Sequence, residues 1–178
     1  CYLAGLFHDA GKFAGGQYHA DREAEEAASV RSASRLLSQH GVQQPLIDDI
    51  CDAVGLLYLE GSSNPVSDII HDSDFLAKAG PLGTAVYFAK SALRGKSIIS
   101  WLLSSASREL TYAACLPLNL RTEAGRNMGT RNARFTQDFF QNLFGDLRKK
   151  HIADLAVRSV QAPSAPTQQT HALSIISH

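Results

Sequence analysis

Hydrophobic side chains recur at three- and four-residue intervals along most of this chain, and the period-two alternation of strands is nearly absent. One such segment begins near Asp21, a residue type that caps helices, and ends at His40 before Gly41. Pro45 opens the next helix, whose apolar positions keep the same spacing: Ile47, Ile50, Val54 and Leu57. The pattern therefore predicts an all-α fold.

Glycine and proline separate the remaining helical segments, which are expected over residues 66–79, 84–93 and 98–110. The pattern breaks at Leu116-Pro117-Leu118, and a long helix is expected from Thr122 to Val160. An apolar stripe on that helix can face either the domain core or a second subunit of a homodimer: Phe135, Phe139, Leu143, Phe144, Leu147, Ile152 and Leu155.

The end of the chain differs in composition from the rest. Residues 161–178 are rich in Pro, Ser, Thr and Gln, which favours a flexible tail, docked at most locally through the apolar residues of 172–176. The helical segments before them are expected to form a single domain over residues 1–160, because 178 residues suffice for one sizeable core and not for two.

Charge and cysteine usage narrow the class of protein. Lys plus Arg and Asp plus Glu both number 17, so no global field favours a nucleic-acid polymer or an anionic membrane as partner. No apolar stretch approaches the roughly 20 residues that span a bilayer, and no secretory signal is visible. The cysteines form no Cys-x-x-Cys pair, which favours reduced thiols in a cytoplasmic protein. A preference for phosphate must therefore come from a local site.

The strongest candidate for chemistry is the segment Leu3-Ala-Gly-Leu-Phe-His8-Asp9-Ala-Gly11-Lys12. An apolar helical run ends there in an imidazole beside a carboxylate, a ligand pair that divalent metals of hydrolytic enzymes use. Gly11 is expected to end the helix, and Lys12 to present a cation to an anionic substrate.

Two ligands do not hold a catalytic metal, and Asp74 in His71-Asp72-Ser73-Asp74 is the best further candidate. Apolar neighbours predict partial burial of Asp74, which then requires a compensating cation. His71 and Asp72 are either partners that orient the ligand or solvated surface, and the sequence favours the surface.

His-Asp-x-Gly-Lys behind Leu-x-x-Leu-Phe resembles the signature of the HD superfamily of metal-dependent phosphohydrolases. The stretch from Thr122 to Arg126 resembles the late Thr-x-x-Gly-Arg element of small bacterial HD-domain hydrolases, and Asp74 matches the last aspartate of the family pattern. The resemblance spans roughly Leu3 to Leu147. It implies an HD-domain helical bundle with a long C-terminal helix.

The resemblance also implies a site. His8, Asp9 and Asp74 would hold a divalent ion (Mn, Mg, Fe, Ni or Zn) together with a histidine on an earlier helix. Because Cys1 falls inside an expected helix, we expect N-terminal residues carrying that histidine to precede it. Glu25 stands where some relatives carry a histidine for a second metal, so it is either an outer-sphere base or part of a solvated helix face.

The implied activity is metal-dependent hydrolysis of a small, nucleotide-like phosphate ester. Lys12 would neutralise developing charge, while Asp74 or Glu25 would orient the nucleophile. The alternative is a degenerate HD module that binds a nucleotide or a protein partner as a sensor.

Three further residues are candidates for substrate binding. Arg126 and Arg131 can grip a phosphate through paired donors, and His19 can line the mouth of the site. Equally, Thr122 can cap the long helix while Arg126 pairs with acidic neighbours.

Overall fold

The fold was analysed in a computed structural model that describes residues 1–13, 25–59, 63–161 and 171–177, with side chains up to residue 157. Contacts between Cα atoms divide the chain into an N-terminal unit, residues 1–73, and a C-terminal unit, residues 74–178. The division falls inside helix α4 (Pro65–Leu76). A single domain over residues 1–160 was expected from the sequence.

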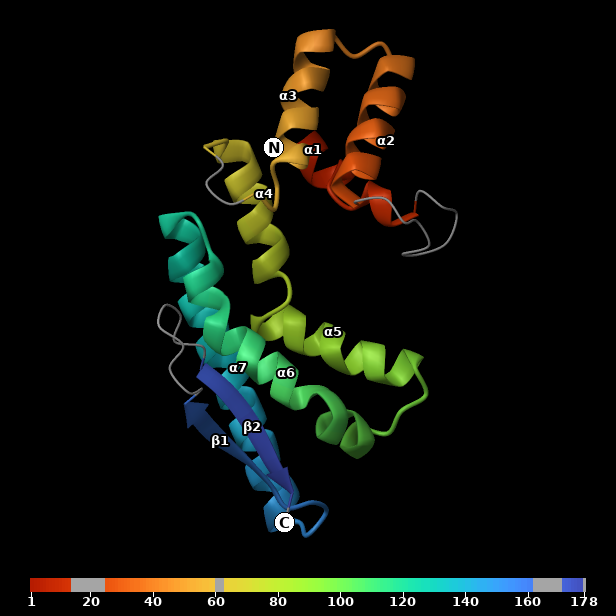
Figure 1. The fold of residues 1–178 in the computed structure, drawn as a ribbon. Helices are drawn as coiled ribbons and strands as arrows, with labels where there is room; N and C mark the ends of the chain where they lie inside the picture. Colours follow the sequence, from red (N-terminus) through yellow and green to blue (C-terminus); the bar gives the residue numbers. More distant parts are fainter. Residues whose placement is uncertain (14–24, 60–62, 162–170, 178) are drawn as a thin grey trace. The chain divides into compact units, whose positions relative to one another are not determined.

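The N-terminal unit contains α1 (Tyr2–Phe7), the short 3₁₀ helix η1 (Ala10–Phe13), α2 (Glu25–Gln39), α3 (Gln44–Gly55) and most of α4 (Figure 1). Helices α2 and α3 pack side by side, and α1 packs against both. The core between them is small and aliphatic: Ala4, Ala33, Leu37, Ile47, Ile50, Ala53, Val54, Leu57 and Ile70.

Helix α3 confirms the sequence pattern. All of its expected inward positions, with Leu57 just beyond its end, are buried, and Pro45 lies in the first turn. The turn before it contains Gly41 at a φ of +72°, a backbone conformation that glycine adopts without steric cost. The expected helix start at Asp21 lies outside the described residues, and within them α2 begins at Glu25.

The C-terminal unit contains α5 (Gly80–Leu93), α6 (Ile98–Asn119), α7 (Glu123–Lys149), β1 (Leu155–Gln161) and β2 (His171–Ser177). Helix α7 packs against α5 and α6 (Figure 1). The core of this unit is rich in aromatic rings: Tyr87, Trp101, Phe140 and Phe144, with Leu102, Ala106, Leu110 and Leu155.

The start of α5 is fixed by a distant residue. The Gly80 backbone N–H donates to the Thr136 hydroxyl of α7 over 2.8 Å. Gly80 has a φ of +73°, and a Cβ atom there would lie 2.7 Å from the Asn132 side chain. Glycine is therefore required at this position both by backbone conformation and by space.

The break expected at Leu116-Pro117-Leu118 was wrong, because α6 continues to Asn119 with Pro117 inside it. Leu116 and Leu120, on either side of the proline, are buried with Ala79 in a further apolar cluster. Packing of these side chains therefore outweighs the hydrogen bond that proline removes.

The expected helix from Thr122 to Val160 is wrong at its C-terminal end, since α7 stops at Lys149. After it, β1 pairs antiparallel with β2, from Leu155 opposite Ser177 to Gln161 opposite His171. Leu155 and Val157 both pack against the aromatic core. Their two-residue spacing is that of side chains on one face of a strand. Residues 171–177 thus form a strand where a flexible tail was expected, and residues 162–170 and 178 lie outside the described ranges.

The all-α class is confirmed, since helices form most of the described chain and this two-stranded ribbon is the one sheet found there. The apolar stripe of α7 packs partly as expected, with Phe144 buried and Phe135 exposed. Within the described residues, no helix is both long and apolar enough to cross a membrane.

Candidate functional site

The His8 ring is oriented by the last turn of α1. His8 Nδ1 lies 2.7 Å from the Gly5 carbonyl oxygen. A carbonyl oxygen only accepts, so Nδ1 is the donor, and in the neutral ring Nε2 keeps its lone pair. Metal-binding histidines are commonly oriented by a hydrogen bond of this kind on the nitrogen that does not bind the metal.

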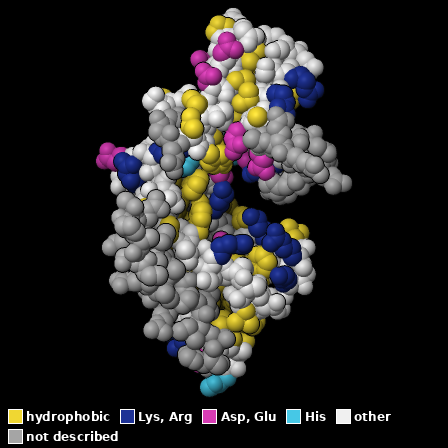
Figure 2. All heavy atoms as spheres, in the orientation of Figure 1, with side chains coloured by type: hydrophobic (Ala, Val, Ile, Leu, Met, Phe, Trp, Pro, Cys, Tyr) yellow, Lys and Arg dark blue, Asp and Glu magenta, His cyan; other side chains and the backbone are white. Residues whose placement is uncertain are grey.

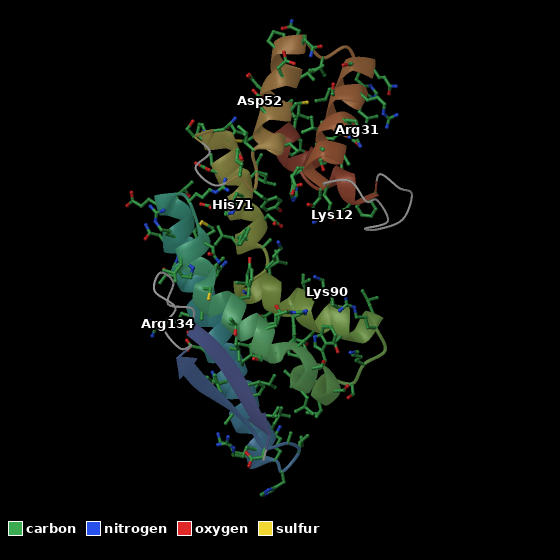
Figure 3. The ribbon with its side chains drawn as sticks, viewed as in Figure 1. Lys12, Arg31, Asp52, His71, Lys90 and Arg134 are labelled. Carbon is green, nitrogen blue, oxygen red and sulfur yellow. The ribbon has the colours of Figure 1, made fainter. Side chains whose placement is uncertain are left out.

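The two oxygens of Asp9 face different partners. Oδ1 lies 3.4 Å from His8 Nε2, and Oδ2 lies 2.7 Å from Lys12 Nζ. Two donors that each bind an ion at about 2.1 Å are separated by roughly 3 Å. The spacing of His8 and Asp9 therefore fits two neighbouring positions around one metal ion, with Lys12 (labelled in Figure 3) on the other side of the carboxylate.

A buried serine holds the backbone of this segment. Ser29 of α2 accepts a hydrogen bond from the Gly11 N–H at 2.8 Å, and its hydroxyl donates to the His8 carbonyl oxygen at 2.9 Å. Ser29 has no exposed surface. We call residues 8–12, clamped in this way, the His-Asp turn.

Gly11 has a different role from the one expected. Helix α1 already ends at Phe7, and Gly11 lies inside η1. A Cβ atom on Gly11 would lie 2.0 Å from the backbone oxygen of Glu25. The glycine is therefore required because η1 packs directly on the first turn of α2, and not because it terminates a helix.

Glu25 lies in that first turn of α2 beside Glu26, and both side chains are partly buried. Acidic side chains are favoured near a helix N-terminus by the helix dipole. The structure thus places the Glu25 backbone against the His-Asp turn.

Asp74 lies in the C-terminal unit, on the last turns of α4. Its side chain is 12% exposed, and Oδ2 lies 2.7 Å from Lys78 Nζ. The expected partial burial and the expected compensating cation are both confirmed. Because His8 and Asp9 belong to the N-terminal unit, the predicted convergence of all three ligands stays a prediction.

The favoured interpretation of His71 and Asp72 as solvated surface was wrong. Both are buried, at 6% and 3% exposure, and His71 Nδ1 lies 3.2 Å from Asp72 Oδ1. The His71 ring (labelled in Figure 3) also meets the Tyr58 ring edge-on, with centroids 6.2 Å apart. A carboxylate this deeply buried requires such a partner, which the sequence pattern does not reveal.

The candidate phosphate-binding residues behave differently from one another. Thr122 caps α7, since its hydroxyl accepts from the Gly125 N–H at 2.9 Å. Arg126 donates to the backbone oxygens of Leu120 and Arg121, at 3.2 and 2.8 Å, rather than to acidic neighbours. Arg131 is exposed, and His19 lies outside the described residues.

In the part of the chain that the structure describes, no group of three His, Cys, Asp or Glu side chains is close enough to hold a metal. His8 and Asp9 thus supply at most two ligands to an ion, and the third proposed ligand, Asp74, stays a prediction. At Cys51, burial raises the pKa of the thiol, and the negative charges of Asp48 and Asp52 raise it further. Both effects disfavour a reactive thiolate at this position.

Ser29 is the residue of this site that the sequence analysis missed. It lies on the α2 face that also buries Ala28, Ala33 and Leu37. A lone hydroxyl on an otherwise apolar helix face was the available signal, because a buried hydroxyl requires a hydrogen-bond partner.

No family model, no curated protein and no solved structure matches this chain. The candidate function therefore depends on the side chains described above and on the spacing of the His-Asp motif. Among these, the geometry of His8, Asp9 and Lys12 is the most specific.

Proposed function

We propose that this protein is a metal-dependent phosphohydrolase of the HD type that acts on a small, nucleotide-like phosphate ester. The supporting observation is the 3.4 Å separation of His8 Nε2 and Asp9 Oδ1 on a turn clamped by Ser29. Two metal-ligand types are thereby presented side by side on a rigid support, which is the arrangement that a hydrolytic metal site requires.

In this proposal His8, Asp9 and Asp74 are ligands of one divalent ion. When bound, such an ion lowers the pKa of a bound water and polarises the phosphoryl oxygen. The hydrogen bond from His8 Nδ1 to the Gly5 carbonyl oxygen keeps the ring oriented, so that Nε2 stays directed to the ligand position.

The remaining residues act on the substrate and the water. Lys12 already neutralises one oxygen of Asp9 and also supplies positive charge beside the reacting phosphoryl group. Asp74 or Glu25 orients the nucleophilic water as a base. Arg131 is exposed and can bind phosphate, while Arg126 binds backbone carbonyls through Nη1 and keeps other N–H groups for a phosphate.

The test is turnover of a panel of phosphate esters by the metal-loaded protein, with Mn, Mg, Fe, Ni and Zn tried separately. We expect His8→Ala and Asp9→Ala to lose bound metal and turnover together. His40→Ala and Asp49→Ala are matched controls, because both side chains are exposed and distant in sequence from the motif. Turnover that survives both motif substitutions, or falls equally in the controls, contradicts the proposal.

A sensor without catalysis is the second candidate, and the ion pair of Asp9 with Lys12 favours it, since the carboxylate already has a cation. A sensor binds its nucleotide with no metal and no turnover. Binding of a nucleotide by the metal-free protein that His8→Ala and Asp9→Ala weaken, without hydrolysis with any of the five metals, would establish this function instead.

A further inference from the structure

A pocket of about 300 Å³ lies on the surface of the C-terminal unit, between α5 and α6. Four cationic side chains line it: Lys78, Lys90, Arg94 and Arg108. Glu109 is the one acidic side chain among the described residues of its lining. Figure 2 shows a gathering of Lys and Arg over α5, the helix on which Figure 3 labels Lys90. We call this site the cationic pocket.

The positive charges are only partly compensated. Lys78 pairs with Asp74, and Arg108 contacts Glu109 at 3.4 Å. Among the described residues, no carboxylate lies within 4 Å of Lys90 or Arg94. The dipole of α5 favours cations near its C-terminal end, which accounts for Lys90 and Arg94 individually. It does not account for the further cations that the turn after α4 and helix α6 bring to the same cavity, Lys78 and Arg108.

Trp101 supplies an independent observation at the same wall. It lines the pocket, it is 4% exposed, and its indole Nε1 has no hydrogen-bond partner among the described residues. Arg94 lies over its ring at 5.2 Å and Lys96 at 5.3 Å. An indole N–H can only donate, so the group that satisfies it must be an acceptor. A buried donor without a partner is costly, and it belongs to a residue that lines the same pocket as the four cations.

The neighbouring wall is rigid. The Tyr87 hydroxyl lies 3.2 Å from the Trp101 carbonyl oxygen and 3.1 Å from the Ser105 hydroxyl. Ser105 also donates to the Trp101 carbonyl oxygen at 2.8 Å. The Ser104 hydroxyl donates to the same oxygen at 3.1 Å. The Trp101 carbonyl oxygen is thus held by three side chains, while the indole nitrogen has no hydrogen-bond partner among the described residues.

We propose that the cationic pocket binds a small organic phosphate. Its volume lies at the lower end of those of small-molecule sites. Guanidinium and ammonium groups from several elements converge there, which is how proteins recognise phosphate oxygens. A polymer backbone is a poorer candidate, because the pocket holds only about 300 Å³ and the chain as a whole carries no net charge. The pocket lining contains none of the proposed metal ligands, and it is linked to them through the ion pair of Lys78 with Asp74.

Trp101 is the chain's one tryptophan, so intrinsic fluorescence reports on this pocket directly. The experiment titrates the full protein with inorganic pyrophosphate in EDTA at constant ionic strength, following fluorescence and, independently, heat by calorimetry. We expect saturable binding that Lys90→Gln combined with Arg94→Gln weakens about tenfold or more, because each lost cation removes a charge-assisted hydrogen bond.

Arg134→Gln is the matched control. Arg134 is exposed on α7 and is not among the residues that line the pocket, and we expect its loss to leave binding unchanged. His8→Ala and Asp9→Ala are likewise expected to bind pyrophosphate normally in EDTA, so failure of the hydrolase proposal leaves this test intact. Circular dichroism of the pocket variant checks that it is folded.

Three results overturn the proposal. The first is an unsaturable response that potassium chloride reproduces at equal ionic strength, and the second is equal binding by the pocket and control variants. The third is tighter binding of a single-stranded oligonucleotide, lost in the same pocket variants, which assigns the pocket to a nucleic acid.

Discussion

The His-Asp turn and the cationic pocket are both polar sites on helical supports, and they differ in how far their polar groups are satisfied. In the turn, His8 Nδ1 donates to a carbonyl oxygen and the Asp9 carboxylate pairs with Lys12. Ser29 satisfies backbone groups of the same turn. In the pocket, cations gather beside Trp101, whose buried indole nitrogen has no hydrogen-bond partner among the described residues. The first arrangement fixes geometry, and the second leaves binding capacity for a ligand.

The sharpest test of the turn is Gly11→Ala. A Cβ atom there meets the Glu25 backbone, which cannot move without shifting α2, so we expect a loss of about 3 kcal/mol in the free energy of unfolding. Urea unfolding followed by far-ultraviolet circular dichroism measures it.

Gly5→Ala is the control, because a Cβ atom at Gly5 in α1 has no neighbour within 4 Å among the described residues. It should leave stability unchanged or raise it by about 0.5–1 kcal/mol. Equal losses in the two variants would contradict close packing of η1 on α2.

The next effect concerns the serine clamp. Ser29→Ala leaves the Gly11 N–H unpaired and removes a donor from the His8 carbonyl oxygen, so we expect a loss of roughly 1–3 kcal/mol. Ser67→Ala is a matched substitution in the same unit, since Ser67 is equally buried but its hydroxyl has no partner among the described residues. It should be neutral or stabilising, and a comparable loss in both variants would mean that the clamp contributes little.

Pyrophosphate should stabilise the unit that contains the cationic pocket. Pyrophosphate at ten times its dissociation constant is expected to raise the stability of the C-terminal unit by about 1.4 kcal/mol through mass action. Trp101 fluorescence during urea unfolding follows this unit. The same concentration should give no such increase in the Lys90→Gln, Arg94→Gln variant, and an equal increase there would place the ligand elsewhere.

The smallest effect lies in the pocket wall at alkaline pH. Burial raises the pKa of the Tyr87 hydroxyl above its ordinary 10.0, and the hydrogen bond to Ser105 only partly offsets this. The unfolded chain therefore loses the Tyr87 proton first, so stability is complete below pH 10 and falls above it, by at most about 1.4 kcal/mol per pH unit. Tyr87→Phe should remove this part of the alkaline loss, and an identical pH profile would refute it.

The regular spacing of apolar residues was sufficient to predict α3 and its buried face, because that helix packs through one stripe in a small aliphatic core. Thr122 was likewise recognisable as a cap from residue type and position alone. Such features depend on local sequence, which is why they could be predicted.

Features that depend on residues far apart in the sequence could not be predicted in this way. The buried position of His71 depends on its packing against Tyr58, and the end of α7 depends on pairing between β1 and β2. The cationic pocket escaped notice because its residues come from separate segments and each one alone resembles an ordinary solvated charge. His8 and Asp9 could be recognised as a candidate pair because they are consecutive in the sequence, while the clamp by Ser29 required knowledge of how α2 packs on η1.

The hydrogen bond between Gly80 and Thr136 has a consequence for the order of assembly. Its two partners are 56 residues apart, so the first turn of α5 lacks this acceptor until Thr136 in the middle of α7 has left the ribosome. A nascent chain that ends near residue 120 should therefore hold Lys90 and Arg94 on an incompletely anchored helix. Capacity to capture a phosphate would then arise late in synthesis, together with the closing of the aromatic core.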